Sequence, residues 1–349
     1  SPFENANTTP HDYTLVDSEE RLAALIAVLN SSDKFSFDTE TTGLDFNEAE
    51  IVGISFSVEK GKGYYLPLLK DYESTRDTLQ RFASIFQDKS KLKIAQNLKF
   101  DWHILHNYGI QISSPIYDTM LCHFLLDADS KHGLDWMSQV YLNYAPIKYE
   151  ELVGKGVRKL DIRRVDLEKI KEYAAEDTDV CYQLYERLDT DIRQLPKVNA
   201  LLHTIELPLI PVLADMERHG VCLDVDFLKE YSLELGTEQE QFMAKIYDAA
   251  GVRFNLDSPK QLGEVLFEKM KIPYTEKKTK TGQYATGEEV LSKLQKEHSI
   301  ARDILDYREL TKLKSTYVDA LPQMVSPKTG RIHTNFNQTI AATGRLRST

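Results

Sequence analysis

One change of hydrophobic pattern limits what this chain can fold into. Up to about residue 86, short apolar runs typical of strands stand among segments with helical spacing, and from Leu98 onward helical spacing takes over. The expected strands lie at 34–38, 51–58 and 63–66, and the expected helices lie near 78–86, 98–107, 118–127, 132–142 and 166–188. Asp17 is expected to cap a further helix that carries an apolar run from Leu22 to Leu29. Strands mixed with helices indicate an α/β domain.

A second, mostly helical part follows a boundary near residues 190–205. Pro208 and Pro211 interrupt a helical pattern there, because proline lacks the backbone donor that a helix interior needs. Helical patterns come next at 226–250, 258–270, 287–297 and 300–320, and then a strand-like stretch from Arg331 to Phe336. Since 349 residues suit two domains of roughly 100–200 residues each, we divide the chain into a tail or linker remnant at 1–12, a first domain at 13–195 and a second at 196–349.

Composition excludes several classes of protein. The formal net charge of −11 argues against a protein that coats nucleic acid through its overall charge. Cys122, Cys181 and Cys222 stand far apart and in no CxxC pair, which fits a reducing compartment. The longest apolar stretches are shorter than the roughly 18 residues of a membrane-spanning helix, and no basic-then-apolar signal segment opens the chain. We therefore expect a cytosolic protein without a membrane partner.

Two acids close the strand expected at 34–38. Asp38 and Glu40 stand at positions i and i+2, so both side chains leave the same face of an extended chain. That geometry lets two carboxylates converge on one hard cation. Taken alone, such a pair is more often just a solvated strand end.

Two later segments place acids on helices. Asn97 can cap a helix whose first turn holds Asp101, and Tyr173 and Asp177 stand at i and i+4 on one helix face. Simple capping and a core tyrosine beside a solvated acid are the plain alternatives. Three such segments in order within one α/β domain favour a shared site over three separate explanations.

These segments resemble the three exonuclease motifs of the DEDD superfamily, in the subgroup with tyrosine in the third motif. The strings FDTETTGL at 37–44 and YAAEDTDV at 173–180 resemble the proofreading domain of the bacterial DNA polymerase I family, also called family A. Similar strings of that family occur at 206–213, 307–317, 327–334 and 343–346. The resemblance covers nearly the whole chain after the first dozen residues.

The resemblance implies a fold and a catalytic site. The fold would be α/β: a ribonuclease H-like exonuclease domain with a mixed sheet flanked by helices, then a mostly α-helical thumb region and the first palm strands. Two divalent cations, Mg²⁺ or Mn²⁺, would be the cofactors. The metal ligands would be Asp38, Glu40, Asp101 and Asp177. Tyr173 would orient the attacking water and complete the set of catalytic residues.

Further residues would contact DNA. Leu44 matches a residue that wedges against the terminal base in the family, and Tyr149 lies near the position of an aromatic side chain that stacks on that base. Asn97 would contact the terminal nucleotide or position the second motif. The plain alternatives are a core leucine at a strand end and a surface tyrosine. The DNA-binding residues of the second domain would be Lys277, Lys278, Arg308, Lys312, Lys314 and Arg345.

The implied function is 3′–5′ exonuclease editing of DNA by two-metal-ion hydrolysis, within a DNA polymerase of replication and repair. In the family the palm acids follow the TGRL segment, and this chain ends at Thr349, so we expect no DNA synthesis from it. Arg347 stands where the family usually has serine. We expect a monomer in the bacterial cytosol or nucleoid that binds a single-stranded 3′ end in one domain and duplex DNA in the other. Two alternatives remain, an RNA 3′-trimming enzyme of the ribonuclease D type and a catalytically idle DNA-binding module.

Overall fold

The computed structural model describes residues 3–349, which form two compact units. Unit 1 holds the chain up to His219 together with Thr334–Thr349, and unit 2 is Gly220–His333. Unit 2 is therefore inserted into the sequence of unit 1. The division at residue 195 was based on the helical pattern and the chain length, and it stays a prediction. Each unit is described here by itself.

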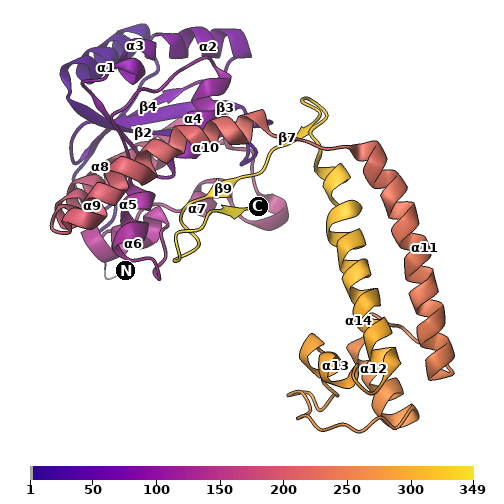
Figure 1. Ribbon diagram of the computed structural model, residues 1–349. Helices are drawn as coiled ribbons and strands as arrows, with labels where there is room; N and C mark the ends of the chain where they lie inside the picture. Colours follow the sequence, from indigo (N-terminus) through magenta and orange to yellow (C-terminus); the bar gives the residue numbers. More distant parts are fainter. Residues whose placement is uncertain (1–2) are drawn as a thin grey trace. The chain divides into compact units, whose positions relative to one another are not determined.

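Unit 1 is built on a six-stranded mixed sheet in the order β1-β4-β3-β2-β5-β6. Figure 1 labels β2, β3 and β4 of this sheet. The strands are β1 (Asp12–Leu15), β2 (Lys34–Thr41), β3 (Ile51–Ser57), β4 (Lys62–Pro67), β5 (Leu92–Ala95) and β6 (Ile116–Asp118). β2, β3 and β4 pair antiparallel, whereas β1 pairs parallel with β4, β5 with β2, and β6 with β5. The predicted mixed sheet with flanking helices is confirmed, and β1, β5 and β6 were not predicted.

The helices of unit 1 are α1 (Glu19–Ser31), α2 (Tyr72–Gln80), α3 (Ala83–Gln87), α4 (Leu98–Asn107), α5 (Thr119–Leu126), α6 (Leu134–Leu142), α7 (Tyr149–Val153), α8 (Leu167–Arg193), α9 (Pro196–Leu201) and α10 (Leu207–His219). Ser18 caps α1 by accepting a hydrogen bond from the Arg21 backbone, so the predicted cap at Asp17 is wrong by one residue. Asp17 instead forms an ion pair with Arg21. The single helix expected near 78–86 is two helices, because the chain bends between Gln80 and Ala83.

The helical pattern was expected to be interrupted at Pro208 and Pro211, but both prolines lie within α10, which continues to His219. A short π-helix at Leu202–Glu206 joins α9 to α10, and Pro211 lies inside α10. Within the described residues, Pro196–His219 is also the one helix whose length and composition alone would allow it to cross a membrane. Polar residues interrupt this segment, which is why the search for apolar runs missed it. Leu202, Leu207 and Ile210 are buried in unit 1.

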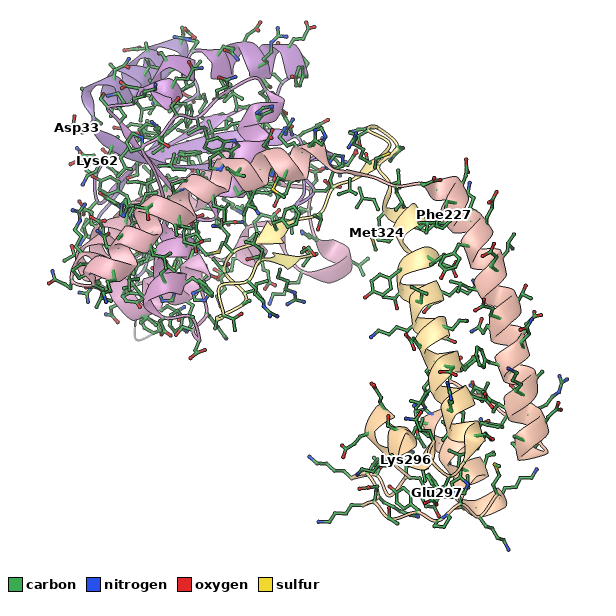
Figure 2. The ribbon with its side chains drawn as sticks, in the orientation of Figure 1. Asp33, Lys62, Phe227, Lys296, Glu297 and Met324 are labelled. Atoms are coloured by element: carbon green, nitrogen blue, oxygen red, sulfur yellow. The ribbon has the colours of Figure 1, made fainter. Side chains whose placement is uncertain are left out.

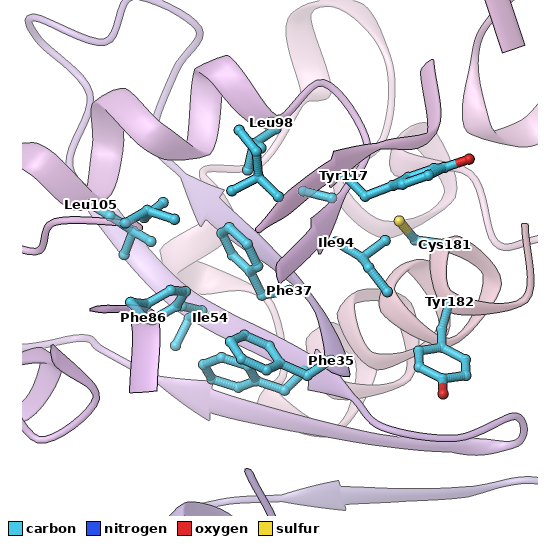
Figure 3. Packing of buried hydrophobic residues seen from close by; sticks show 14 of the residues in the cluster. Phe35, Phe37, Ile54, Phe86, Ile94, Leu98, Leu105, Tyr117, Cys181 and Tyr182 are labelled. Carbon is cyan, nitrogen blue, oxygen red and sulfur yellow. The ribbon is translucent and has the colours of Figure 1, made fainter. Parts of the chain in front are cut away.

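The core of unit 1 lies against the face of β2 that carries Phe35 and Phe37. Both rings pack on Phe86 of α3, with centroid distances of 5.7 and 5.0 Å. Figure 3 shows these three rings together, with Ile54, Leu98 and Leu105 nearby. Because side chains alternate along a strand, Ser36, Asp38 and Glu40 leave the opposite face of β2.

The segment at 1–12 was expected to be a tail, but its described residues make hydrogen bonds to other parts of unit 1. Residues 1–2 of that segment lie outside the described part of the chain. Glu4 donates its backbone N–H to Asn143 and accepts one from Ala145. The His11 side chain contacts Glu172 of α8 at 2.9 Å.

Unit 2 is mostly helical, as predicted. It contains β7 (Val221–Cys222), α11 (Val225–Ala250), α12 (Pro259–Gly263) with a π turn at Glu264–Lys269, α13 (Glu288–Leu294), α14 (Ser299–Lys312) with a π turn at Leu313–Val318, and β8 (Arg331–Ile332). α11 and α14 lie side by side, and β7 pairs antiparallel with β8. In Figure 2, Phe227 and Met324 mark one end of unit 2, and Lys296 and Glu297 mark the other.

Candidate active site

Three carboxylates from two elements meet beside the sheet. Asp38 and Glu40 of β2 and Asp177 of α8 each offer an oxygen, and these oxygens lie within 4.8 Å of one another. The meeting follows from the alternation of β2, which turns both acids toward α8. Ser36, one step earlier on the same face, donates its hydroxyl to the Thr178 carbonyl at 2.6 Å. This bond holds β2 and α8 together next to the acids.

A glycine on the neighbouring strand lets α8 come this close. A Cβ atom at Gly63 of β4 would lie 2.8 Å from both the side chain and the carbonyl of Ala175. Real Cβ atoms do not approach other atoms so closely, so a larger residue would push α8 off the sheet. The position of Asp177 therefore depends on Gly63.

Asp101 enters the same pocket from α4 and is 2% exposed. Its Oδ1 accepts hydrogen bonds from the backbone N–H of Thr39 at 3.0 Å and from the Thr39 hydroxyl at 2.6 Å. Thr39 stands between the two acids of β2, so one strand supplies two acids and fixes a third. The sequence motif pointed to Asp38 and Glu40 and gave Thr39 no part.

Asp118 orients α4 and was missed by sequence reasoning. Its carboxylate accepts the backbone N–H of Asn97 at 3.1 Å and of Leu98 at 3.0 Å, at the start of α4. It also accepts the N–H of Met120 at 2.8 Å, at the start of α5. Asn97 has φ 59° and its side chain makes no capping bond, so the simple capping role for Asn97 is wrong. The available signal was an acid directly before the helical run at 119–126.

Burial raises the pKa of all four acids, and the charge of Asp38 adds to this for the other three. Burial raises the pKa of Asp38 to about 7, and burial together with the charge of Asp38 raises that of Glu40 well above its usual value. Asp101 and Asp177 are raised by burial first and by the Asp38 charge second. Carboxylates in this arrangement are stabilised when a cation binds, because the cation offsets both costs.

The donor set fits a divalent cation. Carboxylate oxygens are the ligands that Mg²⁺ and Mn²⁺ prefer. The buried Oε1 of Glu40 has no hydrogen-bond partner among the described residues, which leaves a ligand atom available.

Tyr173 lies one helical turn before Asp177 on α8. A hydrogen bond from Tyr173 to Asp177 lowers the pKa of that acid against the effect of burial. Burial and the nearby charges of Asp177 and Glu40 raise the pKa of Tyr173 above its usual value. Tyr173 therefore keeps its proton and presents a hydroxyl beside the acids.

The acids line a pocket of about 500 Å³. Leu44, Asn97 and Tyr149 line it too, and their contact with a terminal nucleotide stays a prediction. Leu44 is 89% exposed, which removes the alternative of a core leucine. The Tyr149 ring is half-buried, with its centroid 6.0 Å from that of Tyr173. Lys159 also lines the pocket, and sequence reasoning gave it no role.

The residues predicted to bind DNA in the second domain differ in their surroundings. Arg308 donates to the Thr286 carbonyl, and Lys314 contacts Asp319 at 2.8 Å, so both side chains are engaged within unit 2. Lys278 lies 4.1 Å from the Tyr284 ring centroid. The exposed residues are Lys277, Lys278, Lys312, Arg345 and Arg347. Arg345 and Arg347 belong to unit 1, and Arg347 lies on β10 (Arg347–Ser348), which pairs with β9 (Phe336–Asn337).

Comparison with known proteins agrees with this geometry. Residues 13–193 match the family described as 3′–5′ exonuclease, and residues 225–349 match the family described as DNA polymerase family A. A DNA polymerase I of Pseudomonas aeruginosa is 39% identical over 347 residues, which are 97% of this chain and 38% of that protein. One of Borreliella burgdorferi is 38% identical over 339 residues, 96% of this chain and 36% of that protein.

A solved structure is similar as well. It is the POL domain of Pol1 from M. smegmatis in complex with DNA primer-template and dNTP, with a TM-score of 0.79 and 28% identity. The match covers 96% of this chain and 54% of that one. This chain spans between a third and two fifths of the length of the curated relatives it matches.

Proposed function

Since the chain belongs to the 3′–5′ exonuclease family, we propose that unit 1 hydrolyses the 3′-terminal phosphodiester of DNA, as the editing part of a bacterial DNA polymerase I. The single observation that supports this most is the meeting of Asp38, Glu40 and Asp177 in a pocket with Asp101. Four acids at one point repel one another, and such a cluster makes chemical sense as a site for divalent cations.

Each residue then has a role that its position supports. The ligands of two cations, Mg²⁺ or Mn²⁺, would be Asp38, Glu40, Asp101 and Asp177. When bound, the cations would lower the pKa of an attacking water and stabilise the charge on the leaving 3′ oxygen. Tyr173 keeps its proton and would orient that water through its hydroxyl. Thr39 holds the Asp101 carboxylate in place.

The rest of the pocket would hold the strand end. Leu44 projects its side chain into solvent at the pocket and would wedge against the terminal base. Tyr149 offers a ring on which a base of any sequence can stack, as editing requires. Asn97 would contact the terminal nucleotide from the start of α4.

We further propose that unit 2 acts as the thumb of a family A polymerase and grips duplex DNA. The exposed Lys277, Lys278 and Lys312 are its best phosphate contacts, since Arg308 and Lys314 are engaged within unit 2. The M. smegmatis protein was solved with primer-template DNA, which supports DNA as the partner. We propose a monomer that works in the bacterial cytoplasm.

The test is digestion of a 5′-labelled single strand, as DNA and as RNA side by side, with Mg²⁺ or Mn²⁺. The parent chain should shorten DNA from its 3′ end, and EDTA should stop it. Asp38→Ala should slow digestion by more than about 100-fold, because even changes behind the metal ligands cost about 10–100-fold. Asp33→Ala is the matched control, since Asp33 is an exposed acid just before β2.

Three results would count against the proposal. Equal rates for Asp38→Ala and the parent would place the catalyst elsewhere. Digestion of RNA alone would favour the ribonuclease D alternative. Binding of DNA without any digestion by the parent would favour the idle binding module.

A further inference from the structure

Lys159 stands out by its charge among the residues of the pocket. The described side chains that line the pocket include the four acids and one cation, which is Lys159. The substrate class proposed above is a polyanion with one phosphate for each nucleotide. The proposed cations would offset the charge of the acids at one end of the pocket, and Lys159 adds a positive charge near Tyr149, where further phosphates of the strand would lie.

Lys159 lies next to the proposed stacking residue. Its ammonium is 5.2 Å from the centroid of the Tyr149 ring, and that ring in turn lies 6.0 Å from the ring of Tyr173. The path from the acids therefore runs over Tyr173 and Tyr149 to Lys159. A base stacked on Tyr149 would bring its own backbone phosphate, or that of the next nucleotide, within reach of a flexible lysine side chain.

The charge of Lys159 is free to meet a phosphate. In the segment between α7 and α8, Lys155 pairs with Glu150 at 2.5 Å and Arg163 pairs with Asp161 at 2.6 Å. Lys159 is exposed, and it takes part in no ion pair with the side chains that the structure describes. Among the described side chains of this segment, Lys159 therefore lines the pocket with a charge that no carboxylate pairs with.

We propose that Lys159 binds a backbone phosphate of the single strand, beside the nucleotide that stacks on Tyr149. This inference rests on the function proposed above and adds a phosphate subsite to it. A lysine ammonium is a point charge without base preference, so the contact holds strands of any sequence. Lys159 is a substrate-binding residue, and it takes no part in the chemical step.

The test measures salt dependence, because each phosphate contact releases counterions. The probe is a 5′-fluorescein oligothymidylate with a phosphorothioate at its last linkage, bound to the full chain in Mg²⁺ and followed by anisotropy at several NaCl concentrations. For Lys159→Gln, the slope of log affinity against log salt should fall in magnitude by about 0.7, the value for one contact to a single strand. Affinity at fixed salt should fall about twofold to fivefold, as for one exposed ion pair.

Two variants complete the design. Lys159→Arg keeps the charge and should restore the slope of the parent. Lys155→Gln removes a neighbouring lysine that is paired with Glu150 and does not line the pocket, and should leave the slope unchanged. In steady-state digestion, Lys159→Gln should raise KM and leave kcat near that of the parent.

The outcomes separate this inference from the proposed function. If the parent neither binds nor digests the strand, the proposed function fails and this inference with it. If the parent digests DNA and Lys159→Gln keeps the parent slope, the inference alone is wrong. A fall in kcat at constant slope would also overturn it, because Lys159 would then act only by supporting Tyr149.

Discussion

Substitution of Glu217 in α10 tests how much the buried ion pairs of this residue stabilise unit 1. Its side chain is 1% exposed and lies outside the candidate active site. Its carboxylate accepts hydrogen bonds from Lys99 at 2.5 Å, from His103 at 2.6 Å and from the backbone N–H of Phe336 at 2.7 Å. Changing Glu217 to alanine leaves the ammonium of Lys99, 12% exposed, without the carboxylate that compensates it.

The expected cost follows from that burial. Breaking a buried ion pair by removing one partner costs about 3–5 kcal/mol, because the other charge stays buried. For a domain of roughly 150–250 residues, about 1 kcal/mol moves the melting temperature by about 2–4 °C. Glu217→Ala should therefore lower the melting temperature of unit 1 by about 6–20 °C. Glu217→Gln keeps the shape and one acceptor, so it should fall between the alanine variant and the parent.

Tryptophan fluorescence measures this transition selectively. The chain has two tryptophans, Trp102 and Trp136, and both belong to unit 1. The control is Glu59→Ala, which removes an exposed ion pair with Lys62 and should leave the midpoint nearly unchanged. A Glu217→Ala midpoint within about 2 °C of the parent would refute the reasoning. So would an equal loss in the control.

Three further predictions concern the effect of pH on stability, the hydrogen bond that holds a proposed metal ligand, and the packing of α8 against the sheet. Burial raises the pKa of Glu217, but the hydrogen bonds from its partners outweigh burial and lower this pKa below 4.5. The stabilisation that the Glu217 carboxylate gives to unit 1 is therefore complete above about pH 4.5 and is lost at lower pH. The difference in melting temperature between the parent and Glu217→Gln should narrow only below pH 4.5. Thr39→Val removes the 2.6 Å hydroxyl bond to Asp101 and should slow DNA digestion about 10–100-fold with little change in melting; parent-like digestion would contradict this. Gly63→Ala should destabilise unit 1 by about 1–3 kcal/mol in urea unfolding through its clash with α8, whereas Gly43→Ala, with open space around it, should not.

The acids of the site could be predicted from the sequence, because the spacing within each motif is local. Alternation along β2 is enough to set Asp38 and Glu40 on one face, and helix periodicity is enough to set Tyr173 above Asp177. The order of the three segments then identified the family. What no local pattern contains is the approach of α8 to β2, which depends on Ser36, and that approach is what joins the two halves of the cluster.

The misses share a cause, since each depends on contacts between distant segments. Asp118 reads as an ordinary helix cap, but it also accepts from Asn97, twenty-one residues away. The strands β5 and β6 are short. Their extended conformation depends on pairing with β2 and with each other more than on their amino-acid composition. Arg308 stands with Lys312 on α14, but it turns to the Thr286 carbonyl instead of solvent. Sequence spacing gives the face of a helix and does not show what covers it.

The insertion of unit 2 into unit 1 has a consequence for synthesis on the ribosome. The bond between Phe336 and Glu217 joins residues 119 positions apart, and all of unit 2 is translated between them. At about 5–20 residues per second, roughly 6–24 seconds separate the two partners. During that time Glu217 can pair with Lys99 and His103, which are already made, but its third donor does not yet exist. Unit 1 can therefore reach its final set of bonds only after unit 2 has been translated.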